Sequence, residues 1–381
     1  MLESDLSAMD GGGGKSKKSE IKFINSGTYG CIFRPGISCK GAKENIRYVT
    51  KIQKDKRGLQ TELRISTKIR NIQGYARFFA PVLKSCSVRF AKEDSNELTK
   101  CKIFKAKTEQ QIVSRSYIST KIRYVGNTDL RDHIVKLASK SNILHELWST
   151  HTYLLKALNK LAANNIVHFD LKDNNILIDS GLTVPIIIDF GLSFSKDDLV
   201  PKKYEEVFFN FVDYSYWCID IVVCSYIFNI IGYERSKTEP VQEYQLKTIY
   251  NMFLYGTEHA TEQTEIVNHA FQLQLINSNA HIQTFKQMYW TYFSKYLNKP
   301  WWEVYEELIK YVDTWDNYSV AVIYARLIDR AYFANSANFK NVFEKNQSAM
   351  NRYMNGLEQV LYAAPNERLS IAEFEKYVPK L

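Results

Sequence analysis

Two short polar loops, each bounded by apolar residues, constrain the fold of this chain more than any other feature. The loops read HFDLKDNN at residues 168–175 and DFG at residues 189–191. Between them lie two apolar triplets that predict short strands joined by a turn, at residues 176–178 and 186–188. Asp170, Asn175 and Asp189 therefore present three oxygen-bearing side chains on loops that flank one small hairpin.

These three side chains match what phosphoryl transfer requires, namely an aspartate that orients a hydroxyl and an Asn–Asp pair that holds Mg²⁺. The two loops resemble the catalytic loop H-R-D-L-K-x-x-N and the metal loop D-F-G of eukaryotic protein kinases. The resemblance implies that Asp170 accepts the proton of the substrate hydroxyl and that Lys172 neutralises charge on the γ-phosphate of ATP. It also implies that Asn175 and Asp189 bind Mg²⁺, and Lys172 is typical of serine/threonine kinases.

Residues 24–32 lie between two strand-like segments and resemble the glycine-rich loop of kinases, with Asn25 in place of the first glycine. In that interpretation Gly27 and Gly30 let backbone N–H groups approach the phosphates, and Ile24 and Ile32 cover the adenine. Glycine turns in ordinary hairpins look the same, so this motif gains weight from its position ahead of the others.

The strand expected around residues 48–51 ends in Lys51 and resembles the V-A-I-K strand, whose lysine contacts the α- and β-phosphates. Residues 34–41 would be a loop insertion before it. Glu62, within a predicted helix, is the expected partner of Lys51. Glu44 is the competitor, although it precedes the strand.

Residues 122–126 follow a predicted strand and resemble the hinge that binds adenine through its backbone, with Ile122 as gatekeeper; an ordinary strand end is the alternative. Phe169 replaces the arginine that usually precedes the catalytic aspartate. Because that arginine normally grips a phosphorylated activation loop, its absence predicts a kinase that is not activated through this contact.

Farther along the chain, residues 315–322 resemble the D-x-W-S-x-G start of a buried central helix. The resemblance implies that Asp316 accepts hydrogen bonds from the catalytic-loop backbone, with Asp220 as the rival for this role. Arg368 resembles the arginine that opens the last helix of the family. No A-P-E is present, so the glutamate partner of that arginine is not identified.

The predicted organisation is α+β, with a bilobal, protein-kinase-like fold. We expect a flexible basic tail at 1–20, a β-rich small lobe at 21–125, and a helical large lobe at 126–381 with an insertion at about 195–312. Strands are predicted at residues 21–25, 47–53, 102–106 and 115–125. Helices are predicted at 59–72 and 144–162, with His151 as a core residue, and a capping box at Ser370 opens a last helix.

The six cysteines form no C-x-x-C pair, which predicts reduced thiols in an intracellular, cytoplasmic protein. The apolar stretch 207–231 contains Asn210, Asp213, Asp220 and Asn229, so we expect a buried helix and no membrane span. The formal charge of +9 suits either a basic solvated surface or acidic partners, and nucleic acid is not otherwise indicated. The expected partner is a protein substrate with a Ser/Thr hydroxyl.

The glycine-loop sequence GTYGCIFRP, the sequence WDNYS and the long insertion together resemble serine/threonine kinases of large nucleocytoplasmic DNA viruses, which implies host cytoplasm or virion. Two other functions stay open. A small-molecule phosphotransferase of the aminoglycoside or choline kinase type shares the metal chemistry, although Lys172, DFG and Arg368 favour a protein kinase. A pseudokinase scaffold draws support from Asn25 and Phe169.

Overall fold

The computed structural model describes residues 21–26, 30–37, 39, 46–53, 56–90, 92–208, 214–260, 264–275, 278–333 and 337–380. The predicted tail at 1–20 lies outside these residues. Contacts between Cα atoms divide the chain into unit 1, within residues 1–56 and 82–124, and unit 2, within residues 57–81 and 125–381. The segment 57–81, which the sequence assigned to the small lobe, therefore groups with the larger unit.

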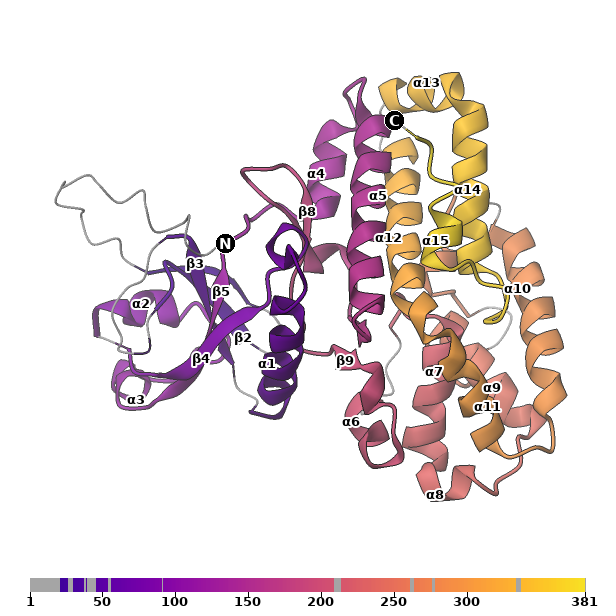
Figure 1. The fold of residues 1–381 in the computed structure, drawn as a ribbon, viewed down its shortest axis with the longest axis horizontal. Helices are drawn as coiled ribbons and strands as arrows, with labels where there is room; N and C mark the ends of the chain where they lie inside the picture. Colours follow the sequence, from indigo (N-terminus) through magenta and orange to yellow (C-terminus); the bar gives the residue numbers. More distant parts are fainter. Residues whose placement is uncertain are drawn as a thin grey trace. The chain divides into compact units, whose positions relative to one another are not determined.

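Unit 1 is built on a five-stranded antiparallel sheet with the order β1-β2-β3-β5-β4 (Figure 1). The strands are β1 (Lys22–Ser26), β2 (Gly30–Arg34), β3 (Tyr48–Gln53), β4 (Val82–Val88) and β5 (Tyr117–Arg123). Cys31, Phe33 and Ile52 are fully buried, because alternate residues of a strand face the same side of the sheet. The strands predicted from 21, 47 and 115 are confirmed as β1, β3 and β5.

The strand predicted at 102–106 is wrong. These residues form successive turns between two short helices, α2 (Ser95–Leu98) and α3 (Glu109–Val113). Phe104 is fully buried and packs edge-on against Phe90 and Tyr117. The apolar side chains in this stretch therefore pack into the core of unit 1 from a turn. The same residue types had predicted a strand.

The prediction of reduced cysteines is also wrong for four of the six. Cys31 is disulfide-bonded to Cys101 and Cys39 to Cys86, and all four lie in unit 1. The partners are 70 and 47 residues apart in sequence, so no local spacing pattern marks them. Cys218 and Cys224 are free and buried in unit 2, as predicted.

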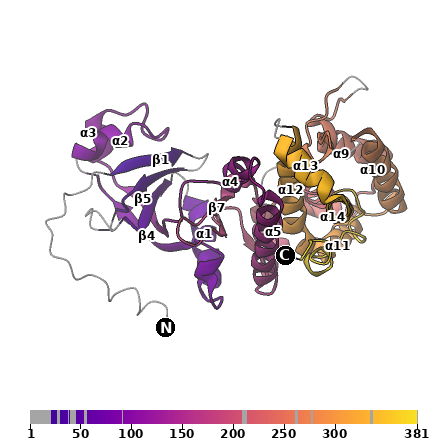
Figure 2. The same cartoon turned by 90° about the horizontal axis from the view of Figure 1, so that it is seen from above.

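Unit 2 is mainly helical, and α12 packs against α4, α5 and α14 (Figures 1 and 2). Its helices are α1 (Lys56–Arg70), α4 (Leu130–Leu137), α5 (Ile143–Ala162), α6 (Tyr204–Val207), α7 (Ile219–Tyr226), α8 (Tyr233–Ser236), α9 (Glu243–Tyr255), α10 (Ser278–Phe293), α11 (Trp301–Leu308), α12 (Trp315–Phe333), α13 (Ala337–Lys345), α14 (Gln347–Leu361) and α15 (Ile371–Phe374). Two short antiparallel strand pairs complete the described part of unit 2, β6 (Ile166–Val167) with β9 (Phe194–Ser195) and β7 (Ile176–Ile178) with β8 (Pro185–Ile187). Isolated bridges, such as the one from Phe79 to Ile187, add to them. The α+β class is confirmed.

Helix α5 matches the helix predicted at 144–162, and His151 lies in the core as expected. His151 is fully buried, stacks on Tyr324 with 3.8 Å between ring centroids, and its Nδ1 pairs with the Tyr353 hydroxyl. The capping box at Ser370 is confirmed too, because its Oγ accepts from Glu373 N and the Glu373 side chain accepts from Ser370 N.

The helix predicted at 207–231 begins later than expected. Helix α7 starts at Ile219 and continues as a π-helical turn from Ile227 to Ile231, which ends at Gly232 with a φ of 87°. Every residue of α7 is buried, in agreement with a core helix. Among the described residues, no helix combines the length and the apolar character needed to cross a membrane.

Candidate functional site

The β7–β8 hairpin holds the two polar loops side by side. Ile176 pairs with Ile187, and Ile188 N donates to Asn175 O at 3.0 Å, directly before Asp189. A ring nitrogen of His168, Nε2, lies 3.0 Å from Ile188 O. Because these contacts join the start and the end of the 168–175 loop to residue 188, the loops carrying Asp170, Asn175 and Asp189 are brought together within unit 2.

Asp170 lies at the centre of a compact hydrogen-bond network. Lys172 Nζ donates to Oδ1 at 3.0 Å and to Oδ2 at 2.9 Å. Asn175 Nδ2 donates to Oδ2 at 3.0 Å and to the Asp170 carbonyl at 2.8 Å. The Tyr214 hydroxyl donates to Oδ1 at 2.7 Å. The carboxylate side chain is 13% exposed and Lys172 is 32% exposed, so this network lies at the surface of unit 2.

Asp189 adopts a left-handed backbone conformation with a φ of 61°, which is uncommon for a residue with a side chain. A Cβ atom at Gly191 would lie 3.3 Å from Asp189 Oδ1, so glycine leaves room for this carboxylate. Between them, Phe190 is buried and packs against His168 and Phe79. The order Asp-Phe-Gly thus combines a strained polar residue, an apolar anchor and a residue without a side chain.

Asn175 and Asp189 could hold a magnesium ion that is also bound by the phosphates of a substrate. Since Asn175 Nδ2 is committed to Asp170, its Oδ1 is the atom suited to a cation. In the part of the chain that the structure describes, no three His, Cys, Asp or Glu side chains gather as an all-protein metal site would. Two protein oxygens are consistent with Mg²⁺, which usually takes one or two carboxylates together with substrate phosphates.

Asp316 fixes the start of the 168–175 loop, as the sequence predicted. Its Oδ2 accepts from His168 N at 2.7 Å and its Oδ1 accepts from Phe169 N at 3.0 Å. Burial raises the pKa of Asp316, while the electrostatic interaction with His168 and the hydrogen bonds from the His168 and Phe169 amides act in the opposite direction. A carboxylate from the first turn of α12 therefore positions two consecutive backbone amides directly ahead of Asp170.

Asp220, the rival for that role, is the partner of Arg368. Arg368 Nη2 donates to Asp220 Oδ1 at 2.7 Å and Nη1 donates to Oδ2 at 3.0 Å, with both side chains buried. Thr314 Oγ1 accepts a further bond from Nη1 at 3.0 Å. Burial alone lowers the pKa of Arg368, but the Asp220 charge outweighs it and the pKa is raised. The sequence did not identify this partner, because nothing around Asp220 links it to Arg368, and Asp220 was considered only as the rival of Asp316.

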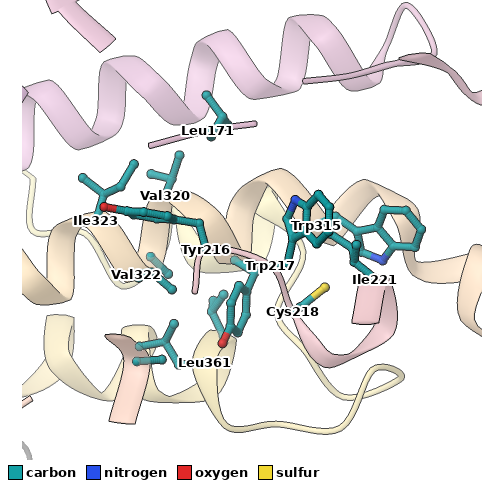
Figure 3. Close-up of a cluster of buried hydrophobic side chains, with 14 of the residues drawn as sticks. Leu171, Tyr216, Trp217, Cys218, Ile221, Trp315, Val320, Val322, Ile323 and Leu361 are labelled. Carbon is teal, nitrogen blue, oxygen red and sulfur yellow. The ribbon is translucent and has the colours of Figure 1, made fainter. Parts of the chain in front are cut away.

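Phe169 occupies an apolar environment in place of the expected arginine. It has a φ of 69°, and its ring lies 4.8 Å from that of Trp217 and 5.2 Å from that of Phe194. Trp217 Nε1 also donates to Phe169 O at 2.8 Å. Figure 3 shows Trp217 and Trp315 in one buried cluster with Leu171 of the same loop. The loop is thus supported at this position by aromatic packing.

Sequence reasoning missed the segment 214–217, which contacts the 168–175 loop through several residues. Besides Tyr214 and Trp217, the Tyr216 hydroxyl pairs with Asp173 Oδ1 at 3.3 Å, and Ser319 Oγ donates to Tyr216 O at 2.8 Å. The sequence YSYW was a visible aromatic signal within the insertion. Nothing in it specified a contact with residues some forty positions earlier.

The residues expected at the nucleotide end lie mostly in unit 1. Ile32 is directly opposite Lys51 in the β2–β3 ladder, and Gly30 is opposite Gln53, where a Cβ would collide with Ile52 O. Lys51 is 7% exposed, while Ile24 is 40% exposed beside a β-bulge. Gly27 lies outside the described residues, as does Glu44. Glu62 is buried on α1 and belongs to unit 2, so the predicted pairing with Lys51 stays a prediction.

A scan against protein-family models found no family that matches this chain, and a search of curated proteins found no match either.

Proposed function

We propose that this chain is a serine/threonine protein kinase that transfers the γ-phosphoryl group of ATP to protein hydroxyls with the help of Mg²⁺. The observation that carries the proposal is the network around Asp170, in which Lys172 and Asn175 bond one carboxylate. The bonds from the His168 and Phe169 amides to Asp316 support it, since the kinase resemblance implies them, and Asp220 supplies the acidic partner of Arg368 that the sequence did not identify. In this proposal the two units correspond to the small and large lobes of a kinase.

In the proposed reaction Asp170 orients the substrate hydroxyl and receives its proton as the oxygen attacks the γ-phosphorus. A new P–O bond forms to the protein, the bond from γ-phosphorus to the bridging oxygen breaks, and ADP leaves. Lys172, already bound to Asp170, stabilises negative charge on the transferred group. Mg²⁺ held by Asn175 and Asp189 would neutralise the phosphate charge. Lys51, Gly30 and Ile32 are assigned to the nucleotide, together with Ile24, Gly27 and Glu62.

The test offers labelled ATP and Mg²⁺ to the purified chain with casein, kanamycin or choline as acceptor. We expect label on casein serine or threonine, and a rate lower by roughly 10²–10⁴ for Asp170→Asn, because general-base catalysis contributes about that factor. Asp189→Asn should also abolish transfer. Label on kanamycin or choline would instead identify a small-molecule phosphotransferase, and no transfer to any acceptor would favour a scaffold.

Asp179→Asn is the matched control for these two substitutions. Asp179 lies in the turn of the same hairpin, where its Oδ1 accepts from Gly181 N and Leu182 N at 2.9 and 3.0 Å. An asparagine keeps an acceptor oxygen while removing the same charge. A comparable loss of transfer in this control would mean that charge near the hairpin, rather than the chemistry of Asp170 and Asp189, governs the rate.

The disulfides bear on where the chain works. Disulfides persist mainly in oxidising compartments, so Cys31–Cys101 and Cys39–Cys86 favour maturation where thiols are oxidised. The cytoplasmic location stays a prediction, and so does the relation to viral kinases. Counting reactive thiols in denatured protein taken directly from its native source distinguishes two free cysteines from six.

A further inference from the structure

Among the described side chains that donate to the Asp170 carboxylate, Tyr214 is the one that the proposed reaction does not use. Its hydroxyl donates to Asp170 Oδ1 at 2.7 Å. This distance lies within the range of about 2.6–3.2 Å at which a general base engages the proton that it removes. An oxygen of Tyr214 thus lies where a hydroxyl must lie to lose its proton to Asp170.

The Asp170 carboxylate has no acceptor position to spare for a further hydroxyl. A carboxylate offers about four lone-pair sites. The described bonds use all of them, with two from Lys172 Nζ, one from Asn175 Nδ2 and one from Tyr214. A substrate hydroxyl can therefore approach Asp170 only by replacing one of these donors.

Tyr214 is the donor that a substrate replaces most readily. Lys172 contributes a charge-assisted bond to both oxygens, and Asn175 is tied to the carboxylate and to the Asp170 carbonyl as well. Tyr214 contributes a single bond from a neutral phenol, and one hydroxyl exchanges for another without loss of charge pairing. Burial, with the nearby Asp170 charge, raises the pKa of Tyr214, so the phenol stays a donor.

The backbone around Tyr214 is anchored independently of the Tyr214 side chain, whose ring packs against those of Tyr216 and Trp217. The turn that carries it is anchored by its neighbours, through Trp217 Nε1 on Phe169 O and Ser215 Oγ on Val267 O at 3.2 Å. Trp217 N also donates to Tyr214 O at 2.9 Å. The Tyr214 side chain itself is half-buried, whereas Tyr216 and Trp217 are buried.

We propose that the Tyr214 hydroxyl is an internal stand-in for the substrate hydroxyl on Asp170, which a protein substrate must displace before phosphoryl transfer. This inference rests on the proposed kinase function. It makes Tyr214 a determinant of substrate affinity, because every acceptor has to compete with a hydroxyl of the chain itself.

The test compares the full chain with Tyr214→Phe in steady-state transfer from Mg-ATP to casein. The variant lacks the hydroxyl that competes with the substrate for Asp170. Because a hydrogen bond to a charged group is among the stronger ones, we expect KM for casein to fall about tenfold. The value of kcat should stay the same, because the displaced phenol has no part in the transfer step. Tyr311→Phe is the matched control, since it also removes a bond of 2.7 Å from a phenol to a carboxylate, that of Glu307, outside the Asp170 network, and KM should then stay at the wild-type value.

The outcomes separate this inference from the proposed function. An unchanged or raised KM in an active Tyr214→Phe variant overturns the stand-in role and leaves the kinase function intact. A fall in kcat at constant KM also overturns it, because Tyr214 would then position Asp170 during transfer. If neither wild type nor Tyr214→Phe transfers phosphate to casein, the proposed function fails and the inference fails with it. Equal urea midpoints for the two proteins confirm that folding is unaffected.

Discussion

In unit 1 two disulfides link strands of the five-stranded sheet to neighbouring turns. Unit 2 instead buries ionic and polar groups among its helices. The core of unit 1 is small, and its fully buried residues include two of the bonded cysteines, Cys31 and Cys101. Small cores often rely on such covalent links because they bury too little apolar surface to offset chain entropy. Unit 2 has a much larger apolar core, which accommodates the buried side chains of Arg368, Asp220 and Asp316. Of these, Asp316 holds the backbone of the 168–175 loop.

The comparison indicates that the two units respond to different perturbations. Unit 1 should be sensitive to reductant, and unit 2 should be sensitive to pH and to the loss of single charges. All six tryptophans belong to unit 2, so tryptophan fluorescence reports on that unit alone. Amide hydrogen exchange in β2, β3 and β5 reports on unit 1.

The largest expected effect is on the buried ion pair of unit 2. Asp220→Ala leaves the Arg368 guanidinium buried without its carboxylate, which should lower the free energy of unfolding by about 3–5 kcal/mol. Urea unfolding followed by tryptophan fluorescence measures this loss. The double variant Asp220→Leu/Arg368→Met should recover most of it, because no charge then stays uncompensated. A double variant as unstable as the single one would show that the pair itself stabilises unit 2.

Unit 1 provides the next largest effect. Replacing Cys31 and Cys101 together by serine should lower the stability of unit 1 by about 2–4 kcal/mol, because the unfolded chain gains conformational freedom. Hydrogen exchange in β2, β3 and β5 should become faster, while the tryptophan transition stays where it is. A tryptophan midpoint that moves with this substitution would contradict the assignment of separate stabilising forces to the two units.

The pH dependence of unit 2 should follow from His151. Burial lowers its pKa to about 3, below its ordinary value of 6.5. Between these values the unfolded chain binds a proton that the folded one does not, so stability falls as pH falls below 6.5. At pH 5.5 the loss should be about 1.4 kcal/mol. In His151→Phe this loss at pH 5.5 should disappear, and any loss that remains should come from other groups such as His269, whose pKa burial also lowers.

The smallest effect should come from the cap of α15. Ser370→Ala removes the acceptor for Glu373 N and should cost about 1 kcal/mol, measured by the same tryptophan transition. Ser370→Asp keeps an acceptor at this position and should retain most of the stability. If Ser370→Ala changed hydrogen exchange in unit 1 instead, the separation between the units would have to be abandoned.

Much of the candidate site could be predicted because its residues are marked locally in sequence. The loops at 168–175 and 189–191, Asp316 and Arg368 each carry recognisable neighbours, and two of the contacts expected for them, from Asp316 to His168 and Phe169, are present. Their spacing along the chain needs no knowledge of the fold. The strands β1, β3 and β5 were equally visible from β-branched and aromatic runs.

The contacts that escaped prediction depend on the folded structure. Asp220 carries no family signature and reaches Arg368 across 148 residues, and Tyr214 reaches Asp170 across 44. The four bonded cysteines lie on β2, β4 and turns that only the sheet brings together. Residues 102–106 were misassigned because a short run with a buried aromatic residue such as Phe104 looks the same in sequence whether it forms a turn or a strand.

The path of the chain through the two units has a consequence for its synthesis. Helix α1 belongs to unit 2 but is encoded between the two halves of unit 1, ahead of β4 and β5. During translation its apolar stripe, with Ile65 and Ile69, emerges well before the residues beyond 125 that later cover it. The nascent chain therefore exposes the apolar face of α1 until the residues beyond 125 have been synthesised, and such transient exposure of apolar surface favours aggregation.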